Sequence, residues 1–387
     1  MKARVIAFYL PQYHPIPEND EWWGKGFTEW TNVAKAKPLF KGHYQPHIPA
    51  DLGFYDLRLP QVRELQAELA RNAGIEGFCY WHYWFGNGRM LLDLPFREVL
   101  ESGKPDFPFC LGWANGSWDN GTWTRTSKAY KKEYIAEQFY SHEDYKAHFF
   151  HVLNAFRDNR YIKVDGKPLF YIHEPLRIPD VTEFISLWQN LAKDNGLEGV
   201  FFVGRANNAS FWHLDEKGNV VHDFHPNVNN SKKMYEDVLK VGFDAVNSWG
   251  IDRVEMIVGG MLKTIFSRVS AKIFKKTILR KYDMKDLVEN YYVPEDSLEN
   301  VFPTIIPNWD RSPREGKNAA IYYNSTPEVF ERELEIAVNL VKGKSPEHKI
   351  LFLRAWNEWG EGNHVEPDLK YGHGYLDVMR NILNEKP

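Results

Sequence analysis

Short apolar runs recur along the chain and alternate with segments whose apolar residues are spaced three or four positions apart. Eight of these runs are continuously apolar rather than alternating in polarity, which is typical of parallel strands covered on both faces. They comprise residues 4–10, 75–81, 107–113, 168–173, 199–204, 243–247, 301–306 and 349–355. The pattern therefore predicts eight parallel strands with helices between them.

Three of the intervening segments carry helix end signals. Pro60 opens the first helix and Gly74 closes it. Asp180, with Glu183 three residues later, resembles a capping box at the start of the second. Thr326, followed by a proline, opens the third.

Eight strands separated by helices predict an α/β fold of the (β/α)8 barrel type, with long loops after the strands. We expect residues 1–387 to form one catalytic domain, because no repeat, low-complexity tract or linker divides the chain. A doubly wound sheet is a weaker alternative, since no dinucleotide-binding fingerprint follows the first strand. A basic amphipathic insertion is predicted around residues 255–283.

Composition removes some classes of function. The chain has 48 basic and 52 acidic residues and a net charge of −4, so no general attraction to nucleic acid is expected. The N-terminal apolar run is too short for a signal peptide, and no run of 18 apolar residues could form a membrane span. The two cysteines, Cys79 and Cys110, fall inside predicted strands and are expected to be inert thiols. These features favour a soluble, cytoplasmic protein.

Aromatic and polar side chains gather where the predicted strands end. In a (β/α)8 barrel the loops after the strands form the active site, and indole rings offer flat faces for sugar rings. We therefore predict one extended glycan-binding groove. Its candidate substrate-binding residues are Tyr9, Tyr13, His14, Trp30, Trp81, His82, Trp84, Trp113, Asn115, Trp118, Glu174, Asn308, Trp309, Trp356, Asn357 and Trp359.

Several polar residues near these strand ends also have ordinary structural interpretations. Glu174 and Asp310 could pair with basic residues on the barrel rim, and Glu29 could brace a loop. His82, like His14, could equally serve as a hydrogen-bonding rim histidine. For Arg354, inside the last strand, an ion pair with a neighbouring acid is the favoured interpretation.

The strongest chemical signal is Glu358 and Glu361, which lie three residues apart just after the last predicted strand. Glycosidic bond cleavage uses two carboxyl groups, one to protonate the departing oxygen and one to activate or supply the attacking group. The alternative is a solvated turn with two ordinary acids, for which no flanking tryptophans and glycines are expected. Residues at this spacing are neighbours in a helical turn but point to opposite faces of a strand, so the separation of the two carboxyls stays open.

Three segments resemble the WbsX family, whose members are named as glycosyltransferases of polysaccharide loci and are similar to the catalytic domain of glycoside hydrolase family 99. They are residues 7–14, residues 22–30, and residues 356–362 with Glu366-Pro367. The resemblance implies a (β/α)8 barrel that acts on α-linked sugars with retention of configuration. It also implies that Glu358 is a base on the sugar 2-hydroxyl, giving an epoxide-like intermediate, and that Glu361 is the acid/base. The chain has Gly360 where the family 99 motif usually carries histidine.

These observations predict a glycoside hydrolase-type enzyme that acts on an α-linked bacterial surface polysaccharide or its precursor. One alternative is a glycosyltransferase or transglycosidase of lipopolysaccharide or capsule biosynthesis, although no Asp-x-Asp motif for a metal-bound nucleotide sugar is present. A barrel that binds glycans without catalysis is a third possibility.

No cofactor or metal is expected, and the partner is an oligosaccharide or polysaccharide. His43 and His47 have the spacing of a helical metal-binding pair, but Pro46 between them predicts a loop. Residues 262–282 alternate basic and apolar side chains. This stretch could be a lid or outer helix with a solvated face, or it could make peripheral contact with an anionic inner-membrane surface.

Overall fold

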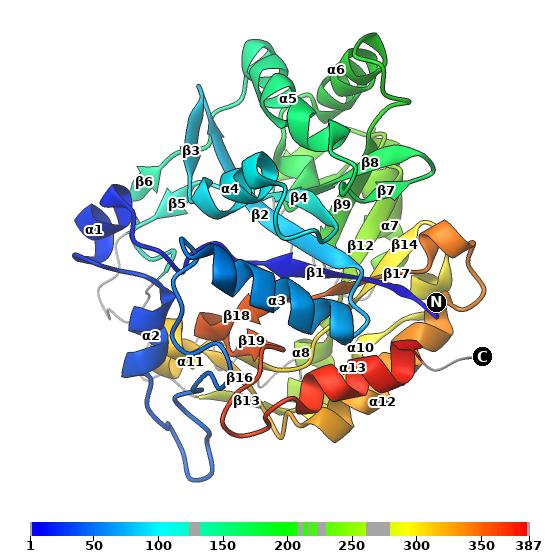
Figure 1. The fold of residues 1–387 in the computed structure, drawn as a ribbon. Coiled ribbons are helices and arrows are strands. Elements are labelled where there is room, and N and C mark those ends of the chain that lie inside the picture. Colours follow the sequence, from blue (N-terminus) through cyan, green and yellow to red (C-terminus); the bar gives the residue numbers. More distant parts are fainter. Residues whose placement is uncertain are drawn as a thin grey trace.

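The computed structural model describes residues 2–123, 132–207, 212–215, 217–222, 230–260 and 279–384. Eight parallel strands in the described part of the chain close into a barrel, because the last strand pairs with the first (Figure 1). Around the barrel they are β1 (Arg4–Tyr9), β2 (Gly77–Gly86), β4 (Phe109–Trp113), β8 (Lys167–Ile172), β9 (Phe201–Asn207), β12 (Ala245–Trp249), β14 (Val301–Ile305) and β17 (Ile350–Leu353).

Each of the eight predicted apolar runs forms one of these strands, which confirms the (β/α)8 barrel. The largest difference is in β2, which continues to Gly86 rather than ending near residue 81. Its outer half pairs with the antiparallel strand β3 (Arg89–Leu91), so the chain leaves the barrel as a hairpin. All ten residues of β2 are buried, so the added half of the strand is part of the core rather than an exposed extension.

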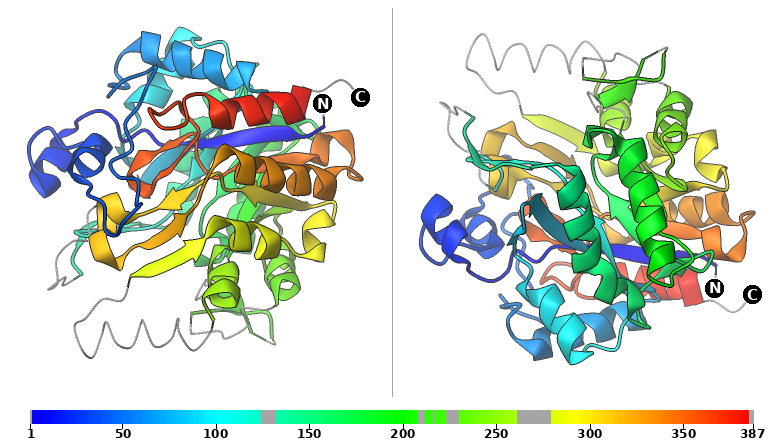
Figure 2. Two further views of the ribbon diagram at one scale, coloured as in Figure 1. Left: turned by 90° about the horizontal axis from the view of Figure 1, so that it is seen from below. Right: turned by 90° about the horizontal axis from the view of Figure 1, so that it is seen from above.

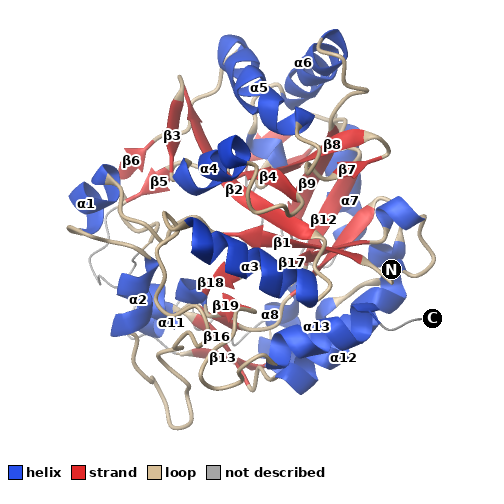
Figure 3. Cartoon of the chain, viewed as in Figure 1, coloured by secondary structure: helices blue, strands red, loops and turns tan. Residues whose placement is uncertain are grey.

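Helices surround the strands, as Figure 3 shows by colour. The helices α5 and α6 lie at the top of Figure 1, and α12 and α13 lie on the opposite side of the strands. Seen from above, in the right view of Figure 2, α5 and α6 are in front of the barrel. The longer helices are α3 (Pro60–Asn72), α4 (Leu94–Ser102), α5 (His142–Arg157), α6 (Val181–Asp194), α7 (Ser231–Lys240), α8 (Ile251–Gly259), α10 (Met284–Tyr291), α12 (Pro327–Val341) and α13 (Gly374–Asn384). None of the helices in the described ranges is long and apolar enough to cross a bilayer.

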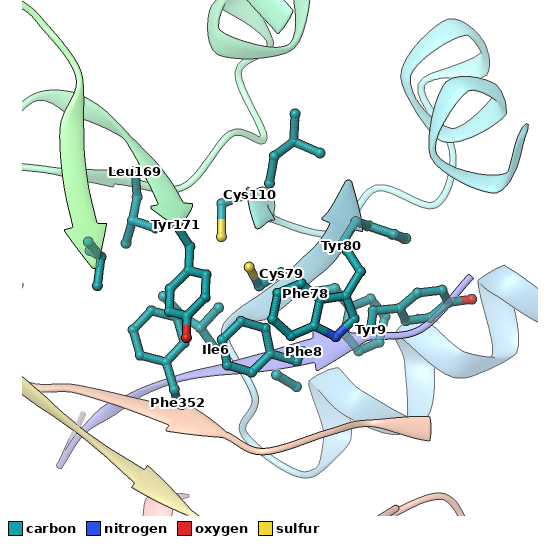
Figure 4. Packing of buried hydrophobic residues seen from close by; sticks show 14 of the residues in the cluster. Ile6, Phe8, Tyr9, Phe78, Cys79, Tyr80, Cys110, Leu169, Tyr171 and Phe352 are labelled. Carbon is teal, nitrogen blue, oxygen red and sulfur yellow. The ribbon is translucent and has the colours of Figure 1, made fainter. Parts of the chain in front are cut away.

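Aromatic rings fill much of the barrel interior, together with aliphatic side chains such as Ile6 and Leu169 and the two cysteines (Figure 4). Phe8 stacks on Trp81 with ring centroids 4.6 Å apart, and its ring contacts those of Tyr171 at 4.7 Å and Phe352 at 5.3 Å. Trp81 therefore points into the barrel, as its alternation with neighbouring residues predicts. The packed interior leaves only the loops beyond the strand ends for a site.

Short elements beyond the strand ends build that region. The chain there forms α1 (Pro17–Trp23), α2 (Glu29–Lys35) and α11 (Ser312–Glu315), and α11 packs against α2. A small sheet of β13 (Arg280–Asp283), β16 (Ala320–Tyr323) and β15 (Trp309–Asp310) lies beside them with its own apolar cluster.

Most of the predicted basic insertion lies outside the described residues, which resume at residue 279. At its edges the chain forms the end of α8 and the strand β13. Membrane contact through residues 262–282 stays a prediction.

The helix end signals are only partly right. Pro60 opens α3, and Thr326 caps α12 by accepting the backbone N–H of Val329. The predicted capping box at Asp180 is wrong, because this residue has φ 50° in the left-handed region and its side chain makes no cap hydrogen bond. A capping side chain needs an extended backbone at the cap position, and spacing alone does not show it.

These two helix starts provide a matched stability test. Replacing Thr326→Ala removes a cap hydrogen bond and should lower the free energy of unfolding by about 1 kcal/mol, measured by urea denaturation. Asp180→Asn keeps a residue tolerant of the left-handed conformation and should change it by much less. Equal effects of the two substitutions would contradict the assignment of the caps.

Candidate active site

The two candidate carboxyls lie on a tight hairpin at the end of the last barrel strand. After β17 the chain forms β18 (Asn357–Glu358), a 3-10 turn η5 (Trp359–Glu361) and β19 (Asn363–His364), which pairs with β18. Glu358 immediately precedes the 3-10 turn and Glu361 ends it. Residues three apart align in a 3-10 helix, so both carboxyls project from one side of the hairpin.

Two glycines allow the hairpin to pack this closely. Gly362 has φ 53°, and a Cβ there would lie 2.8 Å from the Cβ of Asp310. A Cβ on Gly360 would lie only 1.7 Å from the Oε2 atom of Glu29. The side-chain volume at position 360 is thus already filled by a carboxylate from α2.

One guanidinium, that of Arg314 on α11, holds both candidate carboxyls. Its Nη2 donates to Glu358 Oε2 and its Nη1 to Glu361 Oε1, both at 2.7 Å. Its Nε donates to Glu29 Oε2, also at 2.7 Å. All four side chains are buried, so the charges are shielded little by solvent.

The two carboxyls differ in their charged surroundings. Burial raises the pKa of Glu361, but Arg311, Arg314 and Arg354 outweigh it and bring that pKa to about 2. Burial raises the pKa of Glu358 to about 7, and Arg314 offsets this only in part. At neutral pH the free protein therefore has an ionised Glu361 and a Glu358 that is partly protonated.

Indole rings surround the charged cluster, but guanidinium groups already cover some of their faces. Arg354 lies over Trp249 at 4.1 Å and over Trp309 at 4.5 Å, while Arg314 lies over Trp123 at 4.7 Å. These cation–π contacts orient the basic residues toward the acids. A sugar ring that binds at the carboxyls has to use other ring faces.

Three predicted aromatic residues hold the hairpin in place. The Tyr13 hydroxyl donates to the backbone oxygen of Asn357 at 2.5 Å and accepts the N–H of Trp359 at 3.1 Å. The indole N–H of Trp359 donates to Glu366 at 2.6 Å, and Trp30 packs against the Trp359 ring at 5.5 Å. These contacts fix the backbone on both sides of Glu358.

Two predicted asparagines tie the same hairpin to the barrel. The Asn357 side chain accepts the N–H of Leu10 at 2.7 Å and donates to its carbonyl at 3.0 Å. Asn308 makes the equivalent pair of hydrogen bonds with the backbone of His364, both at 3.0 Å. Both amides thus hold backbone groups rather than facing a groove.

Three predicted residues near the end of β2 and β4 point outward to α5. The His82 Nε2 atom lies 2.9 Å from the Nε2 of His148, Trp84 stacks on the same ring, and the Trp113 indole donates to the carbonyl of Trp84 at 2.9 Å. The structure does not bring these side chains to the carboxyls. Tyr83, which alternates with them, faces the site, and Glu358 adds to burial in raising its pKa.

Other predicted residues are enclosed by the barrel wall. The Tyr9 hydroxyl donates to Gln66 at 2.7 Å, and the Nδ1 of His14 lies 3.0 Å from the carbonyl of Pro11. Burial lowers the pKa of His14, so the ring is neutral at pH 7. Trp356 is completely buried.

The predicted polar residues after β4 and β8 are also hydrogen-bonded to other parts of the protein. Asn115 donates to the backbone oxygen of Glu174 at 2.9 Å and accepts its N–H at 2.8 Å. The Glu174 carboxylate is paired with Arg205, which confirms the structural interpretation of this acid. Trp118 is buried among the rings of Tyr83, Phe85 and other aromatic residues.

Only one of the three basic residues of the site could be predicted from the sequence. Arg354 does pair with Glu361, at 3.2 Å, as predicted. Arg314 and Arg311 follow the seventh strand without any recognisable motif, and for Glu29 a loop brace was one of two open interpretations. Their position after barrel strands was the available signal, and it does not distinguish a site residue from any other loop residue.

Asp310 has a different partner from the one expected. Its Oδ2 atom lies 2.6 Å from the Nε2 of His43 and 2.6 Å from the Nε2 of Gln45. His43 is thereby separated from His47, whose ring instead lies beside that of His364. Burial lowers the pKa of His47 to about 4 and that of His364 to about 3, so both imidazoles are neutral.

Residues 5–379 match the family described as Glycosyltransferase WbsX. The chain belongs to this family. It is 33% and 32% identical to two proteins of Xanthomonas campestris pv. campestris, each described as an uncharacterized protein WxcX. Both alignments cover 100% of this chain and 50% of the relative, so the chain spans about half the length of these two relatives.

Solved structures share the barrel of this WbsX-family chain. A glycoside hydrolase-like protein aligns with a TM-score of 0.58 and 14% identity, covering 99% of this chain and 94% of that one. The GH99 endo-alpha-mannosidase of Bacteroides thetaiotaomicron aligns with a TM-score of 0.51 and 13% identity, covering 98% and 96%. At these identities the likeness establishes the fold, while membership of the WbsX family indicates a glycan-processing enzyme.

The packing at Gly360 can be tested by substitution. Gly360→Ala should lower the free energy of unfolding by about 1–3 kcal/mol, because the new methyl group displaces the Glu29 carboxylate from Arg314. Gly343→Ala is the matched control, since a Cβ there meets no atom within 4 Å. Urea denaturation of both variants measures the difference, and a Gly360→Ala variant as stable as the control would contradict the described packing.

Proposed function

We propose that this chain is an enzyme acting on an α-linked glycan, a bacterial surface polysaccharide or its precursor, with Glu358 and Glu361 as its catalytic carboxyls. The observation that carries the proposal is the placement of both carboxyls on one side of a 3-10 turn at the end of the last barrel strand. Active sites of this fold lie at that end of the barrel. The charge difference between the carboxyls adds support, because acid/base chemistry needs partners with different proton affinities.

The roles implied by the family resemblance fit Glu358 well. In this mechanism Glu358 takes the proton of the sugar 2-hydroxyl, and the freed oxygen attacks the anomeric carbon as the bond to the leaving group breaks. A base is most effective when its pKa lies near the working pH, and burial places that of Glu358 at about 7. Water then opens the epoxide-like intermediate, and the second inversion restores the original configuration.

Glu361 must carry a proton to protonate the leaving oxygen, but three guanidiniums keep it ionised in the free protein. Substrate binding therefore has to weaken at least one of these ion pairs. Arg311 is the best placed to move, because its side chain is 36% exposed, against 6% for Arg314 and 9% for Arg354. We propose that a sugar hydroxyl or anionic substituent draws Arg311 away and raises the pKa of Glu361.

Transfer is the second candidate function, and the description of the family as glycosyltransferases favours it. The same two carboxyls could serve a transglycosidase if a sugar hydroxyl, rather than water, opens the intermediate. The two reactions share the first step and differ only in the acceptor. They are separated by their products, a new reducing end or a lengthened glycan.

The carboxyl assignment is tested by Glu361→Gln and Glu358→Gln, each assayed on a panel of α-linked oligosaccharides that includes α-mannosides. Each substitution should lower kcat by about 100-fold or more, because it removes one proton-transfer group. Reducing-end release and mass spectrometry of acceptor products measure hydrolysis and transfer. Glu335→Gln is the control, since that carboxylate is 54% exposed on α12.

Full activity of Glu361→Gln would refute the assignment. Binding of a glycan without hydrolysis or transfer by the unaltered protein would instead favour a non-catalytic glycan-binding barrel. A variant is compared with the unaltered chain only after its melting temperature shows that it is folded.

The pH dependence tests the role of Glu358 as the base. On an aryl glycoside whose leaving group needs no protonation, Glu361 does not have to carry a proton, and only the state of Glu358 matters. Glu358 is neutral below its pKa of about 7 and must be ionised to accept a proton, so kcat/KM on this substrate should rise with pH through about 7. A profile that does not rise, or a rise that persists in the residual activity of Glu358→Gln, would contradict this role.

A further inference from the structure

A second cluster of reactive side chains lies on the other side of the catalytic hairpin. The Nδ1 atom of His47 is 3.0 Å from the Nε2 atom of His364. A carboxylate oxygen of Asp368 completes a group whose three donor atoms all lie within 4.8 Å of one another. His364 and Asp368 lie four residues apart in one segment, whereas His47 comes from the loop between α2 and α3, so no single sequence motif contains all three.

Neighbouring groups fix the orientation of each side chain. The Nδ1 of His364 lies 3.2 Å from the carbonyl of Glu366, which can only accept, so this nitrogen carries the proton and the lone pair of Nε2 is directed toward His47. The His364 ring also stacks on Trp359, with centroids 3.6 Å apart. Metal-ligating histidines are typically oriented in this way by a carbonyl on the second ring nitrogen.

The carboxylate and the second imidazole are likewise held. Asp368 accepts the backbone N–H groups of Lys370 at 2.8 Å and Tyr371 at 2.6 Å through its Oδ1 atom. The His47 ring stacks on Tyr44, with centroids 4.7 Å apart. Both side chains are thus arranged before any ligand arrives, which lowers the entropy cost of binding.

The cluster is accessible to an ion. His47 and Asp368 line a cavity of about 420 Å³, which is bordered by the β15–β16 hairpin and the segment around Tyr44. Asp310, whose carboxylate is held by His43 on the wall of the same cavity, adds negative charge close to His47. A bound cation would therefore meet three donors and a favourable field, with room for a water molecule on the cavity side.

We propose that His47, His364 and Asp368 form a binding site for a divalent transition metal ion of the zinc class. Two imidazoles and one carboxylate suit zinc and its neighbours, whereas magnesium and calcium prefer oxygen ligands throughout. From the sequence no metal was expected, because His47 had only His43 as a possible partner ligand. In the structure His43 is hydrogen-bonded to Asp310 instead.

The site would stabilise the catalytic hairpin. His364 belongs to β19, where its neighbour Asn363 pairs with Glu358 of β18. An ion that joins His364 to His47 would therefore connect the hairpin to the loop between α2 and α3. The proposed role is structural, and its test does not depend on glycan activity.

Zinc binding is tested on the full chain after treatment with a chelator and dialysis. We expect one equivalent of Zn²⁺ to bind in isothermal titration calorimetry and the melting temperature to rise with zinc concentration. Mg²⁺ should produce neither effect. Absence of stoichiometric zinc binding would overturn the proposal.

Two substitutions locate the site. His47→Gln and Asp368→Asn should each weaken zinc binding at least tenfold, and Asp368→Asn keeps an oxygen for the two backbone N–H groups. His373→Gln is the matched control, because His373 is a 43% exposed histidine paired with Asp51. Unchanged affinity in both site variants, or an equal loss in the control, would refute the assignment.

A spectroscopic measurement keeps the test valid if a variant does not fold. Co²⁺ added to the unaltered metal-free chain should give visible absorption bands typical of low-coordinate nitrogen and oxygen ligation, and one equivalent of Zn²⁺ should remove them. The spectrum of hexa-aqua cobalt alone would refute the site.

Discussion

The candidate active site depends on one buried guanidinium. Arg314 donates to Glu29, Glu358 and Glu361, three acids contributed by opposite ends of the chain. Without it these carboxylates would face one another in a site shielded from water, where like charges repel strongly and each bears a desolvation cost. This single side chain joins α2 and α11 to the catalytic hairpin, and it lowers the pKa of both candidate catalytic groups against the effect of burial.

Arg314 contacts both carboxyls, so the difference between them comes from two further guanidiniums, those of Arg311 and Arg354. Glu358 contacts Arg314 alone, whereas Glu361 contacts Arg311 and Arg354 as well. Two residues of the same type on the same turn thus acquire very different proton affinities from their neighbours. Separation of this kind is how paired carboxyls take on distinct roles in acid/base chemistry.

The barrel itself could be predicted because its strands are buried on both faces and are therefore apolar along their whole length. The carboxyls could be predicted because Glu358 and Glu361 lie within one short motif. Their partners could not, since Arg314 and Glu29 become neighbours only after the barrel has closed. Many of the strand-end residues predicted to bind substrate do not face the site, because neighbouring residues of a strand point to opposite sides. In β2, Tyr83 faces the site while His82 and Trp84 face α5. Which residues of a strand point inward depends on how the strand is paired in the barrel, and this pairing is known only from the structure.

The Glu29 carboxylate occupies the space that a side chain at position 360 would need, although the two residues lie near opposite ends of the sequence. The backbone described here can hold a side chain at position 360, such as the histidine of family 99 motifs, or a carboxylate from α2, but not both. Any divergence in substrate preference that began at one of these positions would have required a compensating change at the other. The two residues therefore form a single packing unit, and a relative with a large residue at one position is expected to have a small residue at the other.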